Sequence, residues 1–129
     1  MAQRTKRFAA DVIRFCSTLP RSRVCEVIER QLLRSATSVG ANYREARRAQ
    51  SLRAFLAKLS IVEGEADESL YWLELAEEIG IGDRRTLIRL TDEANQLVAI
   101  IVASKKTARR STRSKLFVSF VVRRSSFVV

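Results

Sequence analysis

The sequence contains no histidine. Histidine is the usual general base, the commonest metal ligand and the side chain that titrates near neutral pH, so its absence argues against most catalytic and metal-dependent functions. Cysteine is also scarce, and the nine-residue separation of Cys16 and Cys25 matches no zinc motif. We interpret both cysteines as buried, reduced thiols and expect no cofactor and no metal ion.

Turn-forming residues and long apolar runs are few as well. One proline, four glycines and 7% aromatic residues in a chain of 129 indicate an all-helical protein, because a sandwich or barrel needs many turns. The length is that of a single domain. We see no signal peptide and no stretch of about 20 apolar residues, so we expect a cytoplasmic protein with no membrane partner.

The net charge of +10 is unevenly distributed along the chain. Residues 1–58 carry 13 basic and 4 acidic groups, residues 59–104 carry 3 and 10, and residues 105–129 carry 8 and none. The segment 1–104 therefore has a net charge of only +2. The high isoelectric point alone overstates the case for nucleic-acid binding.

Apolar residues recur at helical spacing in four segments of residues 1–104. Pro20 ends the first segment because it lacks an N–H, and Ser22, Ser51 and Asp83 are predicted to cap the next three. The segment 105–129 has no acidic residue and no periodic core pattern, so we predict a basic, disordered tail. The predicted core face of the second helix comprises Val24, Cys25, Ile28, Leu32, Val39, Tyr43 and Ala46.

Two groups of residues on the second helix carry functional predictions. Ser35 and Asn42 share its apolar face and are predicted to be buried polar residues, because a buried amide needs a hydrogen bond. The favoured role of Asn42 is a bond to a neighbouring helix that fixes the helix register, and a ligand contact is the alternative. The opposite face carries an arginine strip within an arc of about 80° that could contact phosphates. The arginine strip comprises Arg23, Arg30, Arg34, Arg44 and Arg48.

A subunit interface is predicted from two further patterns. The third helix has a second apolar face where a single bundle would require only one, and the second helix has a strip of small residues. An ordinary helix contact within one chain would explain the small residues equally well. We favour an oligomer in which the acidic third helix of one subunit docks on the basic second helix of the next and closes a ring. The predicted interface comprises Leu33, Ala36, Gly40, Ile61, Glu65, Glu68, Trp72 and Ile79.

The same region resembles a known family. Arg34-Ser35-Ala36 is followed by the runs SVGANYREA (residues 38–46), KLSIVE (58–63) and EADESLYWLEL (65–75). Together these runs resemble the four-helix bundle proteins encoded in intervening sequences of 23S ribosomal RNA. The resemblance implies an up-down-up-down antiparallel four-helix bundle over residues 1–104 that assembles as a homopentamer. The family is similar to the accessory variability protein of diversity-generating retroelements, a pentamer that engages RNA and a reverse transcriptase.

Two functions from different classes follow. The leading hypothesis is a non-catalytic nucleic-acid-binding protein, with RNA favoured over DNA, whose arginine strip repeats around a homo-oligomeric ring. The alternative is a protein-interaction scaffold whose arginines pair with acids of the adjacent subunit, such as an accessory subunit for a reverse transcriptase or a ribosomal RNA-associated complex. Arg34 could equally pair with Glu65 or Glu68 inside one chain. A carboxylate-dependent, magnesium-dependent nuclease is a distant third hypothesis.

Overall fold

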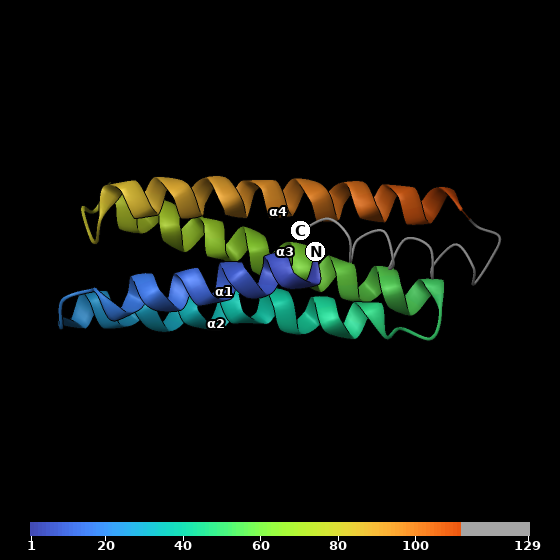
Figure 1. The fold of residues 1–129 in the computed structure, drawn as a ribbon, viewed down its shortest axis with the longest axis horizontal. Helices are drawn as coiled ribbons and strands as arrows, with labels where there is room; N and C mark the ends of the chain where they lie inside the picture. The colour runs from blue at the N-terminus through green and yellow to red at the C-terminus, as the bar shows by residue number, and fades with distance from the viewer. Residues whose placement is uncertain (112–129) are drawn as a thin grey trace.

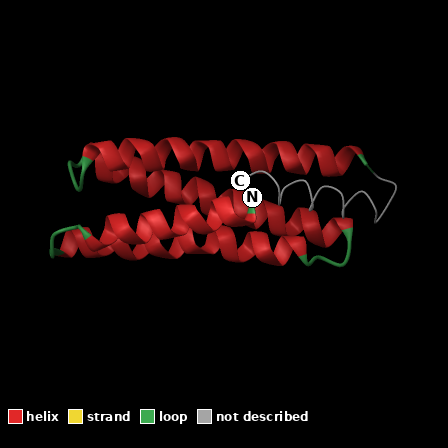
Figure 2. Ribbon diagram, in the orientation of Figure 1, coloured by secondary structure: helices red, strands yellow, loops and turns green. Residues whose placement is uncertain are grey.

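Four α-helices make up residues 1–111, the part of the chain that the computed structural model describes. They are α1 (Ala2–Ser17), α2 (Arg23–Arg47), α3 (Leu52–Glu78) and α4 (Arg84–Arg110). Within these residues, loops join the helices and no strand occurs (Figure 2). The prediction of an all-α protein is confirmed.

Consecutive helices pack side by side and run in alternating directions (Figure 1). The α1–α2 and α3–α4 loops lie at one end of the bundle, and the α2–α3 turn lies at the other. The contact between α1 and α4 closes the bundle, and an ion pair between Arg4 and Glu93, 2.7 Å long, links these two helices. This is the up-down-up-down topology that the resemblance implies. The helix α1 is the shortest and begins partway along the bundle (Figure 1).

The predicted capping residues begin the helices. The side-chain oxygens of Ser22, Ser51 and Asp83 accept hydrogen bonds from the backbone N–H groups of Cys25, Ala54 and Thr86, at 3.0–3.1 Å. Each bond satisfies one of the N–H groups that the first turn of a helix leaves without a partner. The chain leaves α3 through two glycines with positive φ, Gly80 at 75° and Gly82 at 83°. These three caps and the two glycines set where α2, α3 and α4 begin and where α3 ends.

The core lies along the bundle axis and draws apolar side chains from all four helices. The predicted core face of α2 is buried, with one exception. Val24 is 56% exposed. It lies at one edge of the predicted apolar face, next to the exposed Val27, whereas Cys25 in the same turn lies at the other edge and is 4% exposed. The predicted burial of Val24 is therefore wrong.

The last helix extends beyond the predicted domain boundary. We predicted a disordered tail from Lys105, but α4 continues to Arg110. Ala108 is buried because it follows Ile101 by two helical turns on the core face, and Lys105 Nζ lies 2.9 Å from Glu63 Oε1 of α3. These contacts hold residues 105–110 in the bundle. The rest of the predicted tail, residues 112–129, lies outside the described residues.

Both cysteines are buried and unpaired, as predicted. Burial raises the pKa of the Cys16 thiol to about 12, and the nearby charge of Glu29 adds to this effect. A thiol with such a pKa stays protonated and is a poor nucleophile at neutral pH. None of the four helices within residues 1–111 combines the length and the apolar character needed to cross a membrane.

Candidate nucleic-acid interface

The five arginines of the arginine strip are all exposed, but their charges are not equally available. Arg34 Nη1 lies 3.3 Å from Glu65 Oε2, and Arg34 Nη2 donates to Glu68. The hydrogen bond to Glu68 raises the pKa of the Arg34 guanidinium, whereas hydrogen bonds from Trp72 and Arg34 lower the pKa of Glu68. Arg34 is therefore neutralised within the chain. The other four arginines form no ion pair with any residue of 1–111.

The arginine strip runs almost the full length of α2. From Arg23 to Arg48 the helix advances roughly 37 Å at about 1.5 Å per residue. Arg23 therefore lies at the end of the bundle that holds the α1–α2 loop, whereas Arg44 and Arg48 lie at the end that holds the α2–α3 turn. No compact ligand can contact all five.

The antiparallel topology brings further cations to the end that holds the α2–α3 turn. Residues 43–60 and 103–111 lie at that end, and together they hold nine basic residues and one acidic residue; Glu63, which pairs with Lys105, is a second acid beside them. We call this the basic end of the bundle. The predicted arginine strip includes only two of its members, Arg44 and Arg48. Four others belong to the last turns of α4, which we predicted to be a disordered tail, and the remaining three lie outside the arc of the strip. The buried Ala108, in step with Leu97 and Ile101, is the signal that could have extended α4. The basic end comprises Arg44, Arg47, Arg48, Arg53, Lys58, Lys105, Lys106, Arg109 and Arg110.

Most of the charge at the basic end is uncompensated. Lys58 pairs with Glu45, and Lys105 pairs with Glu63. The remaining seven basic side chains are exposed and have no ion-pair partner within residues 1–111. Clustered charges of one sign sum to a potential that attracts counter-ions of the opposite sign. The basic end is thus an anion-attracting surface.

A groove between α1 and α2 adjoins the basic end. We call it the α1–α2 groove; it has a volume of about 450 Å³ and is lined by Lys6 of α1 and by Arg44, Arg47 and Arg48 of α2. The Met1 amino group, one residue before the groove-lining Ala2, has a pKa lowered by burial, with further lowering by Arg47 and Arg4. Burial is the larger cause of that shift, and the part due to Arg47 and Arg4 reflects the positive charge around the start of α1.

The predicted interface residues fall into two groups. The small residues of α2 belong to the bundle itself: Ala36 is fully buried, Leu33 packs against the core, and a Cβ added at Gly40 would lie 3.3 Å from Thr5 Oγ1 of α1. Gly40 therefore permits the close approach of α1 and α2, which is the alternative that the sequence left open. Because Ala36 has no exposed surface, it has none to offer to a second subunit.

The predicted interface residues of α3 lie at the surface beside α2. Ile61 and Ile79 are 44% and 46% exposed, and Trp72 is half-buried. The Trp72 indole N–H donates to Glu68 at 3.1 Å, and its ring lies edge-on to Tyr71 with centroids 4.9 Å apart. Glu65 and Glu68 pair with Arg34 of the same chain. The apolar members of this group are therefore exposed, whereas its acidic members are engaged.

The two predicted buried polar residues behave differently. Ser35 is fully buried, and its Oγ lies 3.0 Å from Ser69 Oγ of α3, where it accepts a hydrogen bond. Asn42 is only half-buried, and its amide donates to the Ser38 carbonyl of its own helix at 2.9 Å. The predicted bond from Asn42 to a neighbouring helix is wrong, because the carbonyl one turn earlier satisfies its amide. Ser35 and Ser69 make the contact between helices instead.

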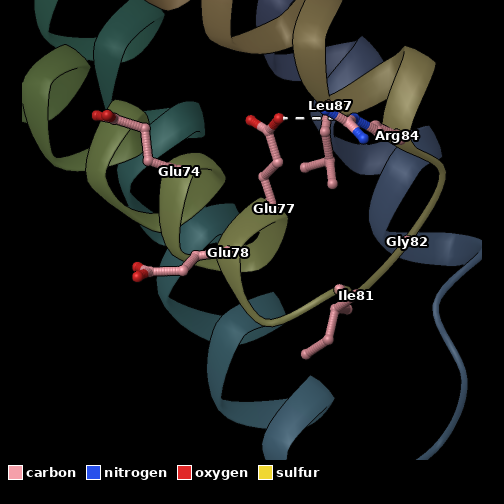
Figure 3. Close-up of a pocket in the computed structure, with 8 residues that line it drawn as sticks. Glu74, Glu77, Glu78, Ile81, Gly82, Arg84 and Leu87 are labelled. Atoms are coloured by element: carbon pink, nitrogen blue, oxygen red, sulfur yellow. Dashed lines mark ion pairs between the residues drawn. The ribbon is translucent and has the colours of Figure 1, made fainter.

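A second cavity lies at the α3–α4 turn, with a volume of about 690 Å³ (Figure 3). Glu77 approaches Arg84 at 3.9 Å, whereas the carboxylates of Glu74 and Glu78 point away from that pair. Across residues 1–111, no three Asp, Glu, Cys or His side chains lie close enough together to hold a metal ion.

Comparison with known proteins places this geometry in a family. The family model described as 23S rRNA-intervening sequence protein matches residues 1–103. The chain belongs to this family. A protein of unknown function from the S23 ribosomal protein family of Bacteroides thetaiotaomicron, whose crystal structure is known, is 32% identical in sequence to this chain. It superimposes with a TM-score of 0.77 over 82% of this chain and 98% of that chain. No curated protein matches the chain.

Membership in the 23S rRNA-intervening sequence protein family confirms the resemblance noted from the sequence. The match covers α1 and most of α4 as well as the runs between residues 34 and 75, since residues 1–103 include them all. It assigns no chemistry to the site.

Proposed function

We propose that this family member is a non-catalytic nucleic-acid-binding protein, with RNA favoured, that assembles into a ring of identical subunits. The observation that carries the proposal is the basic end of the bundle, where seven basic side chains have no acidic partner within residues 1–111. Phosphates are the natural partners for such a surface, because displacing condensed counter-ions from a polynucleotide favours its association with cations. Arginine also offers paired donors that match phosphate geometry.

Salt titration tests this function. The full-length protein is titrated with single-stranded RNA and duplex DNA at increasing salt concentration. If four to six basic residues contact phosphates, the logarithm of the RNA affinity falls against the logarithm of salt with a slope of about −3 to −4. Replacing Arg113, Lys115, Arg123 and Arg124 by glutamine should leave this slope unchanged within about one unit, because the site lies in residues 1–111. A failure to bind RNA at low salt contradicts the proposal.

Self-association, as a homopentamer, is the second part of the proposal. Ile61 on α3, Ile79 at the C-terminal cap of α3, and Val24 and Val27 on α2 are exposed to 44–56%. The bond between Ser35 and Ser69 sets the register of α2 and α3, so Val24 and Val27 lie near Ile79, whereas Ile61 lies farther along α3, beside the last turns of α2. Exposed aliphatic side chains on adjacent helices support association, because their burial is favourable.

The scaffold alternative receives less support, because Glu65 and Glu68 already pair with Arg34 inside the chain. These acids are therefore engaged before any neighbouring subunit arrives. The apolar residues of α3 remain available for assembly.

Replacing Ile61 by lysine should disrupt the ring. The substitution would place a charge where an apolar side chain is buried, and losing that burial costs about 2 kcal/mol per interface. Light scattering on the parent should give a mass near 73 kDa, about five times the 14.6 kDa of one chain. The variant should shift towards the mass of one chain.

Ile88→Lys is the matched control. Ile88 is 51% exposed on α4, away from the α2–α3 surface, so this variant should keep the mass of the parent. A parent that scatters as a monomer, or an Ile61→Lys variant that retains the parental mass, would contradict the proposed ring interface.

A further inference from the structure

We propose that the α1–α2 groove is a subsite for a short, single-stranded, phosphate-bearing segment of nucleic acid. The inference rests on the proposed nucleic-acid-binding function and assigns to it a particular cavity and a particular strand state. We infer the class of ligand from the charge of the residues that line the groove, from its volume and from the small residues in its lining.

The walls of the α1–α2 groove carry four cations from two helices. Lys6 comes from α1, and Arg44, Arg47 and Arg48 come from α2. None of the four has an ion-pair partner within residues 1–111, and the one acid lining the groove, Glu45, pairs with Lys58. Four cations facing one cavity without internal compensation favour a ligand with more than one negative charge. A run of phosphodiesters has that property.

Small residues of both helices form part of the lining of the groove. Ala2, Ala9, Gly40 and Ala41 line it, and at Gly40 the two helices approach so closely that a Cβ would lie 3.3 Å from Thr5 Oγ1. Small residues at these positions leave space between α1 and α2, and the long basic side chains line the same space. A volume of about 450 Å³ falls within the usual range of about 300–1,000 Å³ for small-ligand sites. One or two nucleotides of a single strand fit such a space, whereas a duplex is too wide to enter it.

The groove lacks a surface for reading bases. The aromatic residue among its described lining residues is Tyr43, which is only 2% exposed and offers no face for stacking. The Thr37 hydroxyl donates within its own helix, to the Leu33 carbonyl at 2.6 Å. Recognition of bases uses stacking and donors aimed at base edges, whereas contacts to phosphates carry no sequence information. The groove therefore holds a strand by its phosphates and accepts any base.

Filling the groove without changing its charge tests the proposal. Ala41 is exposed on α2, so Ala41→Leu should preserve the helix while its side chain occupies the cavity. Ala57→Leu is the matched control, because Ala57 is equally exposed on α3 and does not line the groove. Binding of tetra-uridylate to the full-length protein is measured by calorimetry, and binding of a long single-stranded RNA by fluorescence polarisation.

We expect Ala41→Leu to weaken tetra-uridylate binding by about tenfold or more and long-RNA binding by less than about threefold, because the basic end still attracts the longer strand. Ala57→Leu should behave as the parent. Tetra-adenylate and the deoxy form of the tetranucleotide should bind the parent within about threefold of tetra-uridylate.

Three results would overturn the subsite. They are an unchanged tetranucleotide affinity in Ala41→Leu, a parent that binds long RNA but no tetranucleotide, and a base preference above about tenfold. The first two leave the proposed nucleic-acid-binding function standing, since long RNA still binds. If the parent protein binds neither the tetranucleotide nor the long RNA, both the nucleic-acid-binding function and the subsite are refuted.

Discussion

Replacing Arg48 and Arg53 by glutamate should weaken RNA binding by about 100-fold at moderate salt. Both side chains are exposed at the basic end, and neither has an ion-pair partner within residues 1–111. Each substitution removes one phosphate contact and introduces a repulsive charge, so about tenfold per site is expected. In a ring, the loss is repeated in every subunit, which increases the effect on a long RNA.

The fold should tolerate this double variant. Arg48 caps the C-terminus of α2, where a negative charge is unfavourable, whereas Arg53 lies in the first turn of α3, where it is favourable. The two effects on stability, each about 0.5 kcal/mol, oppose one another. Circular dichroism should therefore give parental helix content, and fluorescence polarisation should measure the loss of RNA affinity.

Arg21→Glu with Arg23→Glu is the matched control for this loss. It makes the same change in net charge at the opposite end of the bundle, and both arginines are exposed without an ion-pair partner within residues 1–111. We expect its RNA affinity to fall by less than about tenfold. An equal fall of RNA affinity in the two variants would show that the whole arginine strip, or net charge alone, governs binding. The basic end would then not be the RNA-binding site.

Gly82→Ala should lower the free energy of unfolding by about 3 kcal/mol. Gly82 has a φ of 83°, which L-residues rarely adopt, and an added Cβ would lie 2.6 Å from the Phe15 ring of α1. Phe15 is buried in the core, so it cannot swing away without losing its packing. For a chain of this size the loss corresponds to a fall of about 10 °C in Tm, which thermal unfolding followed by circular dichroism would measure.

Gly64→Ala should have the opposite effect and is the control for the glycine substitution. Gly64 lies exposed in the interior of α3, and an added Cβ would meet nothing within 4 Å. Alanine is favoured over glycine in a helix, so we expect a gain of about 0.5–1 kcal/mol. A Gly82→Ala variant as stable as the parent would mean that Phe15 does not constrain the α3–α4 turn.

The comparison of Arg34 with Arg48 separates what can be inferred from periodicity from what cannot. Helical spacing placed both arginines on the outer face of α2, and both are exposed. Only the structure distinguishes them, because Arg34 lies opposite Glu65 and Glu68, whereas Arg48 has no acid beside it within residues 1–111. Spacing along one helix defines its faces, but the register between two helices decides which charges pair.

The same reasoning applies to the two polar residues on the apolar face of α2. Counting residues around the helix grouped Ser35 with Asn42, yet Ser35 meets Ser69 in the core whereas Asn42 bonds to its own helix. A helical projection shows the direction in which a side chain leaves its helix. It does not show which residue of a neighbouring helix lies opposite that side chain. The contact that bridges α2 and α3 could not be assigned without the packed bundle.

The sequence by itself determined the four helices, their capping residues, most of the core and the family, because these depend on local chemistry and on spacing within one segment. The tertiary structure alone decided that the last turns of α2 and α4, about sixty residues apart in the chain, lie at one end and concentrate cations there. It also decided that α1 and α2 enclose a basic groove above Gly40. Both features arise where different helices meet, and such meetings depend on register and packing that no single segment encodes.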